Sequence, residues 1–445
     1  MLKRKAEAAI NNWILESKTA LLVSGARQVG KTYTIRNCLS KAKRDYIEIN
    51  LIEQPELIPV LECTQSVDDL VINLSAATNH SFIKGETIIF IDEVQEVRDI
   101  VTRIKFWVDD GRFKYILSGS LLGIELQGLR SAPVGYLEEI QMFPMDFGEF
   151  IISSGVQQDV IDYLRECYEK QQVVSELIHD KMLQHFRRYL VVGGMPAAVQ
   201  EYVGSGDISK VNRIQENILK LYKKDFTKYE DIDRRLMLIE IFDVIPSQLL
   251  KHNLRFNYSD IKKGLRYERM VNSFVWLVSA GVAIATYNTS EPRIALSQNS
   301  KNSLLKLYSS DVGLLTSQYG NALRTKILIG DSKVNLGGVY ENAVAQELNA
   351  HGFKSYFYNR HGIGELDFLI EEDAAVIPIE VKSGKDYYVH SALSKVIENK
   401  EYEIKKGYVL SNYNVSTQGR IIYLPIYMSM FINDNVALPI LKPIE

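Results

Sequence analysis

One short stretch near the N-terminus limits the folds that are open to this chain. The apolar run TALLV passes directly into SGARQVGKT, so Gly25, Gly30, Lys31 and Thr32 fill the pattern G-x-x-x-x-G-K-[ST]. Glycines at these places let backbone N–H groups turn toward phosphate oxygens, and a helix that starts there adds a partial positive charge. Lys31 would reach the β- and γ-phosphates, and the Thr32 hydroxyl would ligate Mg²⁺. The stretch predicts a strand, a phosphate-binding loop and a helix.

Two acids at the end of a second apolar run extend this prediction. TIIFIDEVQ ends its apolar part in Asp92 and Glu93. We interpret Asp92 as a holder of Mg²⁺ or its water and Glu93 as the group that polarises the attacking water. An Asp here could also be a helix cap, but two acids favour the catalytic interpretation. The next run ends in Ser-Gly-Ser, so Ser120 or Ser118 is expected to sense the γ-phosphate, although such a tripeptide is also ordinary in turns. Candidates for an arginine finger are Arg27, Arg103 and Arg130.

The first third of the chain alternates between two kinds of pattern. TALLVSG, DYIEINL, TIIFIDEV and FKYILSGS are apolar and β-prone, and residues of helical periodicity lie between them. This alternation is typical of a parallel sheet with crossover helices. We therefore predict an α/β nucleotide-binding domain over residues 1–150.

The rest of the chain divides into three predicted regions. Residues 151–240 are helical in pattern, with a break at VVGGMPAAV. Residues 241–325 suit a winged-helix module: a helix capped by Ser259, then a helix, a glycine stop and a strand. A helical connector fits that region equally well. A polar segment at about 320–338 resembles a linker, and residues 335–445 form a last α/β unit.

Length and composition exclude several classes of protein. A chain of 445 residues should hold roughly two to four domains. The net charge of -3 means that nucleic-acid binding would need a local basic patch. Cys38, Cys63 and Cys167 lie far apart, which argues against a zinc site or a disulfide framework and suits a reducing cytosol. The N-terminus resembles no signal peptide, and no apolar run is long enough to span a bilayer, so we expect a cytoplasmic protein without membrane partners.

Charged residues interrupt an apolar stretch near the C-terminal end, ELDFLIEEDAAVIPIEVKSG. If this is a hairpin whose turn centres between Asp373 and Ala374, Asp367 lies opposite Glu380, and Lys382 shares their face. Two adjacent carboxylates repel unless a cation lies between them. The pattern therefore predicts a site for Mg²⁺ or Mn²⁺, with Lys382 placed to position a nucleophilic water.

A helix upstream of this hairpin could complete the site. GGVYENAVAQEL carries Glu341 near its start, and this residue would supply a third carboxylate. The alternative is that these acids and Lys382 only form salt bridges on a solvated face.

Several stretches together resemble a known family. They are GARQVGKT, IIFIDEVQ, ILSGSLLG, SAPVGYLEEIQMFPMDFGEF, YLVVGGMPAAV, LYSSDVGLL, VYENAVAQEL, GELDFLI and IPIEVKSG. They resemble uncharacterised prokaryotic ATPases that join an AAA-like P-loop domain to a C-terminal domain of the PD-(D/E)XK, restriction-endonuclease-like fold. The resemblance covers nearly the whole chain. It departs at Tyr136, where relatives often carry a basic residue.

The resemblance implies roles for the residues already singled out. It implies ATP binding at the phosphate loop, Mg²⁺ and water roles for Asp92 and Glu93, and a nuclease-like site at Glu341, Asp367, Glu380 and Lys382. Domains of that fold have often lost catalysis and only bind. Three functions stay open: an ATP-dependent nuclease that cuts nucleic acid, a nucleotide-controlled switch for a protein or DNA partner, and a nucleotide-binding protein with negligible hydrolysis. AAA-type ATPases often form homo-oligomers.

Overall fold

The computed structural model of the chain contains two compact units. It describes residues 2–433 apart from 65, 98–99, 121–134, 230–231, 252, 265 and 332. Unit 1 comprises Met1–Phe143 and Val275–Val282, and unit 2 comprises Pro144–Phe274 and Ala283–Glu445. These two units do not follow the four predicted ranges one to one, and those ranges stay a prediction about domain organisation.

Unit 1 is built on a five-stranded sheet whose order is β2-β3-β4-β1-β5. Every pairing between these strands is parallel. The strands are β1 (Ala20–Gly25), β2 (Tyr46–Asn50), β3 (Ile88–Asp92), β4 (Lys114–Ser118) and β5 (Leu137–Met142). The parallel sheet and the first four strands confirm the prediction. Strand β5, with the sequence LEEIQM, was not predicted, because an edge strand with polar, exposed residues lacks the apolar run of a central strand.

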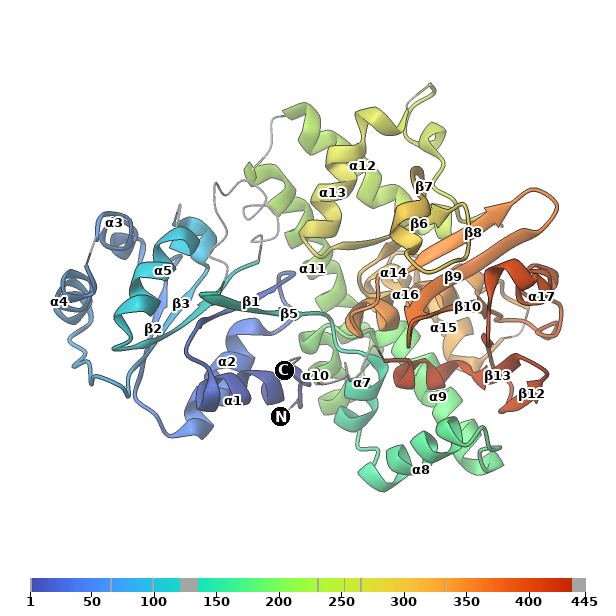
Figure 1. Cartoon of the computed structure of the whole chain (residues 1–445), viewed down its shortest axis with the longest axis horizontal. Coiled ribbons are helices and arrows are strands. Elements are labelled where there is room, and N and C mark those ends of the chain that lie inside the picture. The colour runs from blue at the N-terminus through green and yellow to red at the C-terminus, as the bar shows by residue number, and fades with distance from the viewer. Residues whose placement is uncertain are drawn as a thin grey trace, which may run out of the picture. The chain divides into compact units, whose positions relative to one another are not determined.

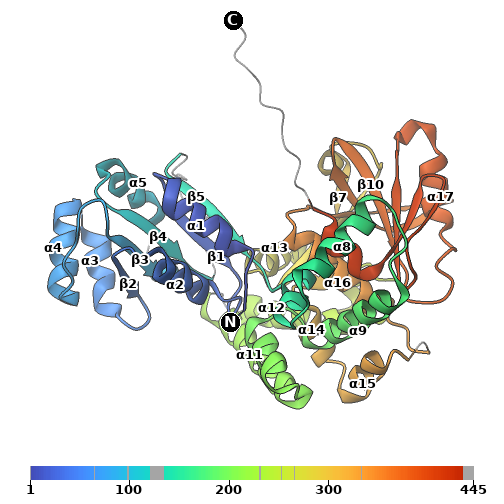
Figure 2. The same cartoon turned by 90° about the horizontal axis from the view of Figure 1, so that it is seen from below.

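Helices flank this sheet (Figure 1). They are α1 (Ala6–Glu16), α2 (Lys31–Ala42), α3 (Ile58–Cys63), α4 (Val67–Thr78) and α5 (Ile100–Asp110), with short 3₁₀ turns η1 (Pro55–Leu57) and η2 (Val94–Glu96). One core cluster joins alternate strand residues, such as Leu22 and Ile91, to Leu70 of α4 and Trp107 of α5. The α3 and α4 helices lie side by side next to the edge strand β2 (Figure 2).

Helices dominate the first half of unit 2, as the sequence predicts. They are α7 (Phe147–Ser153), α8 (Gln158–Glu169), α9 (Glu176–Val192), α10 (Pro196–Ser205), α11 (Ile208–Tyr229) and α12 (Ile232–Leu249). The predicted break at VVGGMPAAV is the connection from α9 to α10. Further along the chain come α13 (Val271–Ser279), which belongs to unit 1 from Val275 onward, and four helices of unit 2: α14 (Val312–Ser317), α15 (Asn321–Ile329), α16 (Gly337–Ala350) and α17 (Ser391–Glu398).

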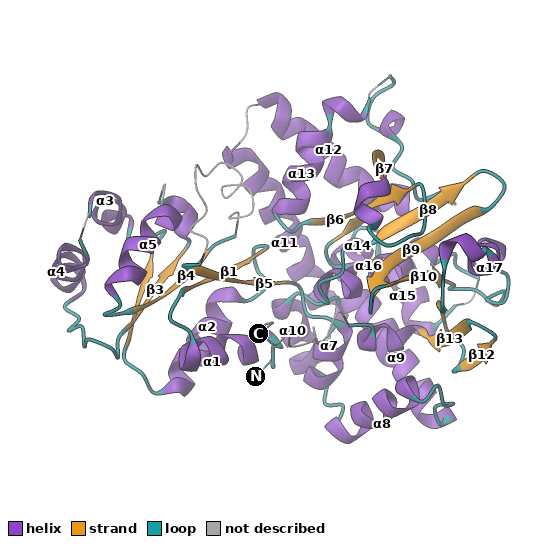
Figure 3. Cartoon of the chain, in the orientation of Figure 1, coloured by secondary structure: helices purple, strands orange, loops and turns teal. Residues whose placement is uncertain are grey.

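Unit 2 contains a mixed eight-stranded sheet of order β12-β13-β11-β10-β9-β8-β6-β7. Its strands are β6 (Ala283–Thr289), β7 (Ser300–Ser309), β8 (Tyr356–Arg360), β9 (Gly364–Glu372), β10 (Ala375–Val381), β11 (Gly407–Ser411), β12 (Ser416–Gln418) and β13 (Ile421–Pro425). Figure 3 shows these strands in orange with α16 and α17 against them. Further 3₁₀ turns are η4 (Tyr258–Asp260), η5 (Tyr267–Arg269), η6 (Leu296–Asn299), η7 (Lys400–Tyr402) and η8 (Ile426–Phe431).

The winged-helix prediction is not confirmed. A helix, a glycine and a strand do follow one another at α13, Gly281 and β6, but the β6–β7 hairpin does not stand apart as a wing. It continues the C-terminal sheet, because β6 also pairs in parallel with β8. Two local predictions are wrong. Ser259 caps no α-helix: it lies inside the single 3₁₀ turn η4, which the side chain of Asn257 caps. Half of the predicted linker is the helix α15.

Helix α16 lies at the centre of unit 2 and carries buried polar side chains. All residues from Gly338 to Leu348 are buried. Asn342 accepts a hydrogen bond from the Ser309 backbone N–H at 2.8 Å and donates to the Ser309 carbonyl at 3.0 Å. Gln346 accepts from the Val312 backbone N–H at 2.8 Å. Buried amides satisfied in this way act as specific clamps, so α16 holds the end of β7 and the start of α14 in one register.

Two family-like motifs, GGMP and SDVGLL, contact each other beside α16. Asp311 accepts hydrogen bonds from the backbone N–H of Gly194 at 2.6 Å and of Leu314 at 2.8 Å. Burial raises the pKa of Asp311 to about 6. A side chain is excluded at Gly193, where a Cβ would lie 2.2 Å from Asp311 Oδ1, and at Gly194, where it would lie 1.9 Å from the Met145 carbonyl oxygen. These motifs therefore have a packing role in unit 2.

Replacing Gly194 tests this packing role. Gly194→Ala forces a methyl group against the Met145 carbonyl and should lower the free energy of unfolding by about 1–3 kcal/mol, the usual cost of overpacking. Urea unfolding followed by circular dichroism measures the loss. Gly204→Ala in α10 is the matched control, because its Cβ would have no neighbour within 4 Å. Equal midpoints for the two variants would contradict the packing role.

Candidate functional site

The first candidate site lies where β1 meets α2 in unit 1. Gly25 ends β1 with a φ of 135°, and a Cβ there would lie 2.1 Å from the Met142 carbonyl oxygen of β5. Gly30 precedes α2 with a φ of 91°. Both glycines have a positive φ, which favours a residue without a Cβ. Gly25 also has no room for a Cβ, because β5 lies too close. The two glycines thus shape the loop as the sequence predicts for a phosphate cradle.

Lys31 is the first residue of α2 and is held inside the loop. Its Nζ donates to the carbonyl oxygens of Gly25 at 3.0 Å and Ala26 at 2.9 Å. Burial lowers the pKa of Lys31 to about 8, although the charges of Glu93 and Asp92 oppose this shift. Phosphate oxygens in the loop would offer the ammonium stronger acceptors than neutral carbonyls. The ammonium of Lys31 is thus held in the loop that the sequence predicts to bind phosphate.

Thr32 and Asp92 meet at the ends of neighbouring elements. The Thr32 hydroxyl donates to Asp92 Oδ2 at 2.7 Å, and the Ser118 hydroxyl of β4 donates to Asp92 Oδ1. The backbone N–H of Glu93 also donates to Asp92 Oδ1, at 3.0 Å. Asp92 is buried, so these bonds fix its orientation. A hydroxyl and a carboxylate brought together in this way are hard oxygen donors of the kind that Mg²⁺ prefers.

Glu93 has an unusual backbone conformation beside Asp92. Its φ is 58°, in the left-handed region that residues other than glycine rarely adopt. Gln95 Nε2 donates to Glu93 Oε2 at 2.5 Å and holds the carboxylate. Ser120 is buried and accepts a hydrogen bond from Arg27 Nε at 3.4 Å. Arg27 therefore reaches from the phosphate loop to the residue predicted to sense the γ-phosphate.

The other arginine candidates differ in their positions. Arg103 donates to the Thr64 carbonyl oxygen at 3.2 Å, so it is engaged elsewhere in unit 1. Arg130 lies outside the described residues. The aromatic ring of Tyr136 lies 5.2 Å from Lys105 Nζ, so a cation accompanies this position. A residue that the sequence did not indicate is Arg4, whose Nη1 donates to the Val29 carbonyl oxygen of the loop at 2.6 Å.

The second candidate site lies in unit 2 on the predicted hairpin, and the predicted register is confirmed. Strands β9 and β10 pair Glu372 with Ala375 and Phe368 with Ile379. Extending the register by one pair brings Asp367 opposite Glu380. The turn residues Asp373 and Ala374 have φ values of 50° and 53°. Positive φ at both central residues is typical of the two-residue turns that join twisted strands.

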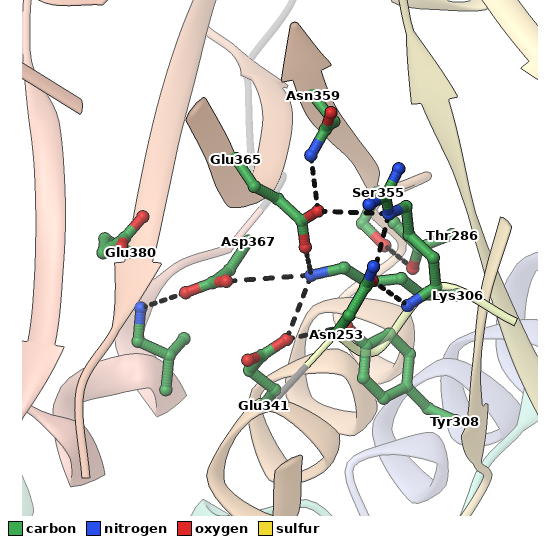
Figure 4. A network of polar contacts seen from close by, with 12 residues as sticks. Asn253, Thr286, Lys306, Tyr308, Glu341, Ser355, Asn359, Glu365, Asp367 and Glu380 are labelled. Carbon is green, nitrogen blue, oxygen red and sulfur yellow. Dashed lines mark hydrogen bonds and ion pairs between the residues drawn. The ribbon is translucent and has the colours of Figure 1, made fainter. Parts of the chain in front are cut away.

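A buried lysine, Lys306 of β7, lies among the carboxylates of this site (Figure 4). Its Nζ is 2.9 Å from Glu365 Oε1, 3.3 Å from Glu341 Oε2 and 3.7 Å from Asp367 Oδ1. Tyr308 OH also donates to Glu341 Oε2, at 3.1 Å. Burial alone would lower the pKa of Lys306, but the surrounding carboxylates raise it well above its usual value. The surrounding carboxylates therefore favour the charged form of Lys306.

Glu380 and Lys382 form the other end of the site. Lys382 Nζ donates to Glu380 Oε1 at 2.7 Å, while the buried Glu380 Oε2 has no hydrogen-bond partner among the described residues. The Val381 backbone N–H donates to Asp367 Oδ2 at 2.8 Å. Burial, followed by the negative charge of Asp367, raises the pKa of Glu380, and the same two causes raise the pKa of Glu341. These acids resist ionisation unless more positive charge reaches them.

The structure thus brings the four predicted residues of this site into one network but also adds members. Among the described residues, Glu341, Asp367 and Glu380 do not form a group whose possible metal-ligand atoms all lie within 4.8 Å of one another. The ammonium of Lys306 lies between Glu341 and Asp367, and Glu380 lies on the other side of Asp367 (Figure 4). No sequence pattern indicated Lys306 or Tyr308, since they lie far upstream on another strand. The one available signal was a lysine in the otherwise apolar end of β7, LLKLY.

Comparisons with known proteins are informative mainly for the N-terminal part of the chain. Residues 17–151 match the family model described as an AAA domain. Residues 183–324 and 336–428 match two domains of unknown function, DUF8612 and DUF4143. No curated protein matches the chain. Within the described residues, every helix is too short or too polar to cross a membrane.

Two solved structures show low similarity to the chain. The Walker-type ATPase paby2304 of Pyrococcus abyssi is 17% identical with a TM-score of 0.42, over 72% of this chain and 96% of that one. The Orc1 protein of Aeropyrum pernix, solved in complex with DNA, is 13% identical with a TM-score of 0.28, over 74% of this chain and 93% of that one. The AAA model therefore carries the comparison: residues 17–151 are similar to an AAA domain, and their parallel α/β sheet resembles that of P-loop ATPases.

Removing the central lysine tests the second site. Lys306→Met leaves buried carboxylates without their cation and should lower the free energy of unfolding by about 3–5 kcal/mol. The loss should shrink toward acid pH, because Glu341 has a raised pKa and its protonated form needs no cation. Urea unfolding at several pH values measures both effects. Lys170→Met, which breaks an exposed pair with Glu166, is the control and should leave the midpoint nearly unchanged.

Proposed function

We propose that this protein is a Mg²⁺-dependent ATP hydrolase. The observation that carries the proposal is the contact of the Thr32 hydroxyl with Asp92 at 2.7 Å, beside a buried Lys31 at the start of α2. The glycine-containing loop, the lysine, the hydroxyl group and the carboxylate are together the groups needed to bind a nucleoside triphosphate and its metal ion. ATP rather than GTP follows from the family resemblance, and the sequence has no guanine-reading N-K-x-D near the loop.

Each residue would have a distinct task. Thr32 and Asp92 would hold Mg²⁺, which neutralises charge that develops on the phosphate oxygens. Lys31 would exchange its carbonyl acceptors for phosphate oxygens. Glu93, held by Gln95, would orient the water that attacks the γ-phosphate. Arg27 and Ser120 lie together and would contact the same phosphate.

Two substitutions separate binding from hydrolysis. Lys31→Ala should abolish ATP binding, because the loop then lacks its buried cation. Glu93→Gln should retain ATP binding but slow phosphate release by roughly 100-fold or more, the usual contribution of a general base. Binding is measured with a fluorescent ATP analogue and hydrolysis by phosphate release. Equal, near-zero release by the natural protein and Glu93→Gln would instead indicate a nucleotide-binding protein with negligible hydrolysis.

A second candidate function belongs to unit 2. We infer that its acidic site binds nucleic acid or cuts it with Mg²⁺ or Mn²⁺, as the nuclease-like resemblance implies. The supporting observation is the buried Glu380, which faces Asp367 across the hairpin and pairs with Lys382 at 2.7 Å. Lys306 favours the alternative, because a fixed ammonium already offsets part of the negative charge that would attract a metal ion. In that alternative the nucleotide state controls a non-catalytic binding module for protein or DNA.

A cleavage assay distinguishes these two possibilities. If unit 2 is a nuclease, labelled DNA or RNA should be cut with Mg²⁺ or Mn²⁺ and ATP, and Asp367→Ala and Lys382→Ala should each abolish the cut. Lys385→Ala removes an exposed lysine from the same loop and is the matched control. Cutting that survives Lys382→Ala would indicate a contaminant. No cutting by a protein that still hydrolyses ATP would favour the binding module. The oligomeric state and the cytoplasmic location stay predictions.

A further inference from the structure

A second group of ionisable side chains lies in unit 2, away from the acidic site on the hairpin. It consists of Asp146, Glu347 and His351, whose ligand atoms all lie within 4.8 Å of one another. Asp146 caps the start of α7, and Glu347 and His351 lie one turn apart at the end of α16. Their side chains are only 4%, 0% and 3% exposed. Two carboxylates and an imidazole are groups that can ligate one metal ion.

Each carboxylate has one oxygen that is held by the fold. Asp146 Oδ1 accepts from the Glu149 backbone N–H at 2.8 Å. Glu347 Oε1 accepts from the Phe147 backbone N–H at 2.6 Å and from Tyr189 OH at 3.2 Å. The second oxygen of each carboxylate lies near the same atom, His351 Nε2. The α7 cap and Tyr189 thus orient both carboxylates toward the imidazole.

The other ring nitrogen of His351 determines what Nε2 can do. Nδ1 lies 2.7 Å from the Ile432 carbonyl oxygen. A carbonyl oxygen can only accept, so Nδ1 carries a proton. In a neutral imidazole the lone pair of Nε2 then faces two carboxylate oxygens. A cation between these atoms, either a proton on Nε2 or a metal ion, would be attracted by both carboxylates. A histidine that donates its far N–H to a backbone carbonyl is typical of a metal ligand.

The distances favour a metal ion over a proton. His351 Nε2 lies 3.6 Å from Asp146 Oδ2 and 3.8 Å from Glu347 Oε2. Charge-assisted hydrogen bonds between such atoms are shorter, at about 2.7–2.9 Å. Two ligands that each lie about 2.0–2.2 Å from one tetrahedral ion are roughly 3.3–3.6 Å apart. The observed spacing is close to the second pattern.

We propose that Asp146, Glu347 and His351 bind one divalent ion of the Zn²⁺ class. One imidazole and two carboxylates are a suitable donor set for Zn²⁺, and water would supply the fourth position. The low exposure of the three ligand side chains gives the ion a structural role: it ties the start of α7 to the end of α16. This site is independent of the proposed ATPase and nuclease activities, and no sequence motif indicated it, because Asp146 lies about 200 residues from the other two ligands.

Metal analysis of the full chain tests the proposal. Protein purified without a metal-affinity tag, stripped with a chelator and given Zn²⁺ should retain about one tightly held ion per chain. Its thermal midpoint should fall on stripping and recover with Zn²⁺. Bound Co²⁺ should give visible absorption bands. His351→Gln should lose the ion, the bands and the recovery, because an amide is a poor zinc ligand.

Three further variants make the result specific. His361→Gln changes an exposed histidine and should behave as the natural protein does. Asp367→Ala removes the acidic site on the hairpin, so an ion that persists in it belongs to the proposed site. Glu347→Gln keeps an oxygen for the Phe147 N–H and replaces His351→Gln if that variant fails to fold.

Two results would overturn the proposal. One is a stripped protein that takes up no stoichiometric Zn²⁺ and whose thermal midpoint does not change when the metal is added. The other is a His351→Gln protein that binds Zn²⁺ as tightly as the natural chain.

Discussion

The buried polar side chains of α16 are the constraint on which unit 2 depends. Asn342 and Gln346 bind backbone groups at the end of β7 and the start of α14, and Glu347 binds the backbone of α7. A buried amide or carboxylate that loses its partners pays the full cost of desolvation, so few alternative arrangements are stable. One helix thereby fixes the positions of elements that are up to about 200 residues apart in the chain. The same helix carries Glu341 of the acidic site.

Lys306 changes the charge balance of the acidic site. A hairpin with Asp367 and Glu380 on opposite strands would by itself leave two carboxylates in need of a cation. Lys306 enters from β7 and pairs with three carboxylates while it stays almost fully buried. Lys306 pairs with none of the oxygens of Glu380, whose neighbouring cation is Lys382, and Glu380 Oε2 has no hydrogen-bond partner among the described residues. Any metal bound here would therefore be expected at the Asp367 and Glu380 end.

The residues of the phosphate loop in unit 1 lie close together in the sequence, whereas those of the acidic site do not. Gly25, Gly30, Lys31 and Thr32 lie within eight consecutive residues, and a strand and a helix that both form from local patterns hold them. Asp92 joins them because parallel strands end at the same edge of the sheet. Such a site can be read from the chain almost completely, and the AAA model that matches residues 17–151 agrees with it.

By itself the sequence determined the parallel sheet of unit 1, the phosphate loop, the helical character of residues 151–240 and the register of the β9–β10 hairpin. Each depends on periodicity or turn chemistry within a few residues. Only the tertiary structure decided the placement of the β6–β7 hairpin in the C-terminal sheet, the helix α15 in the predicted linker, and the meeting of Lys306 with Glu341, Glu365 and Asp367. The tertiary structure also decided that Asp146 lies next to His351. These contacts join distant segments, and the energy that selects them comes from burying apolar surface and from satisfying buried polar groups in the folded core, which no local pattern encodes.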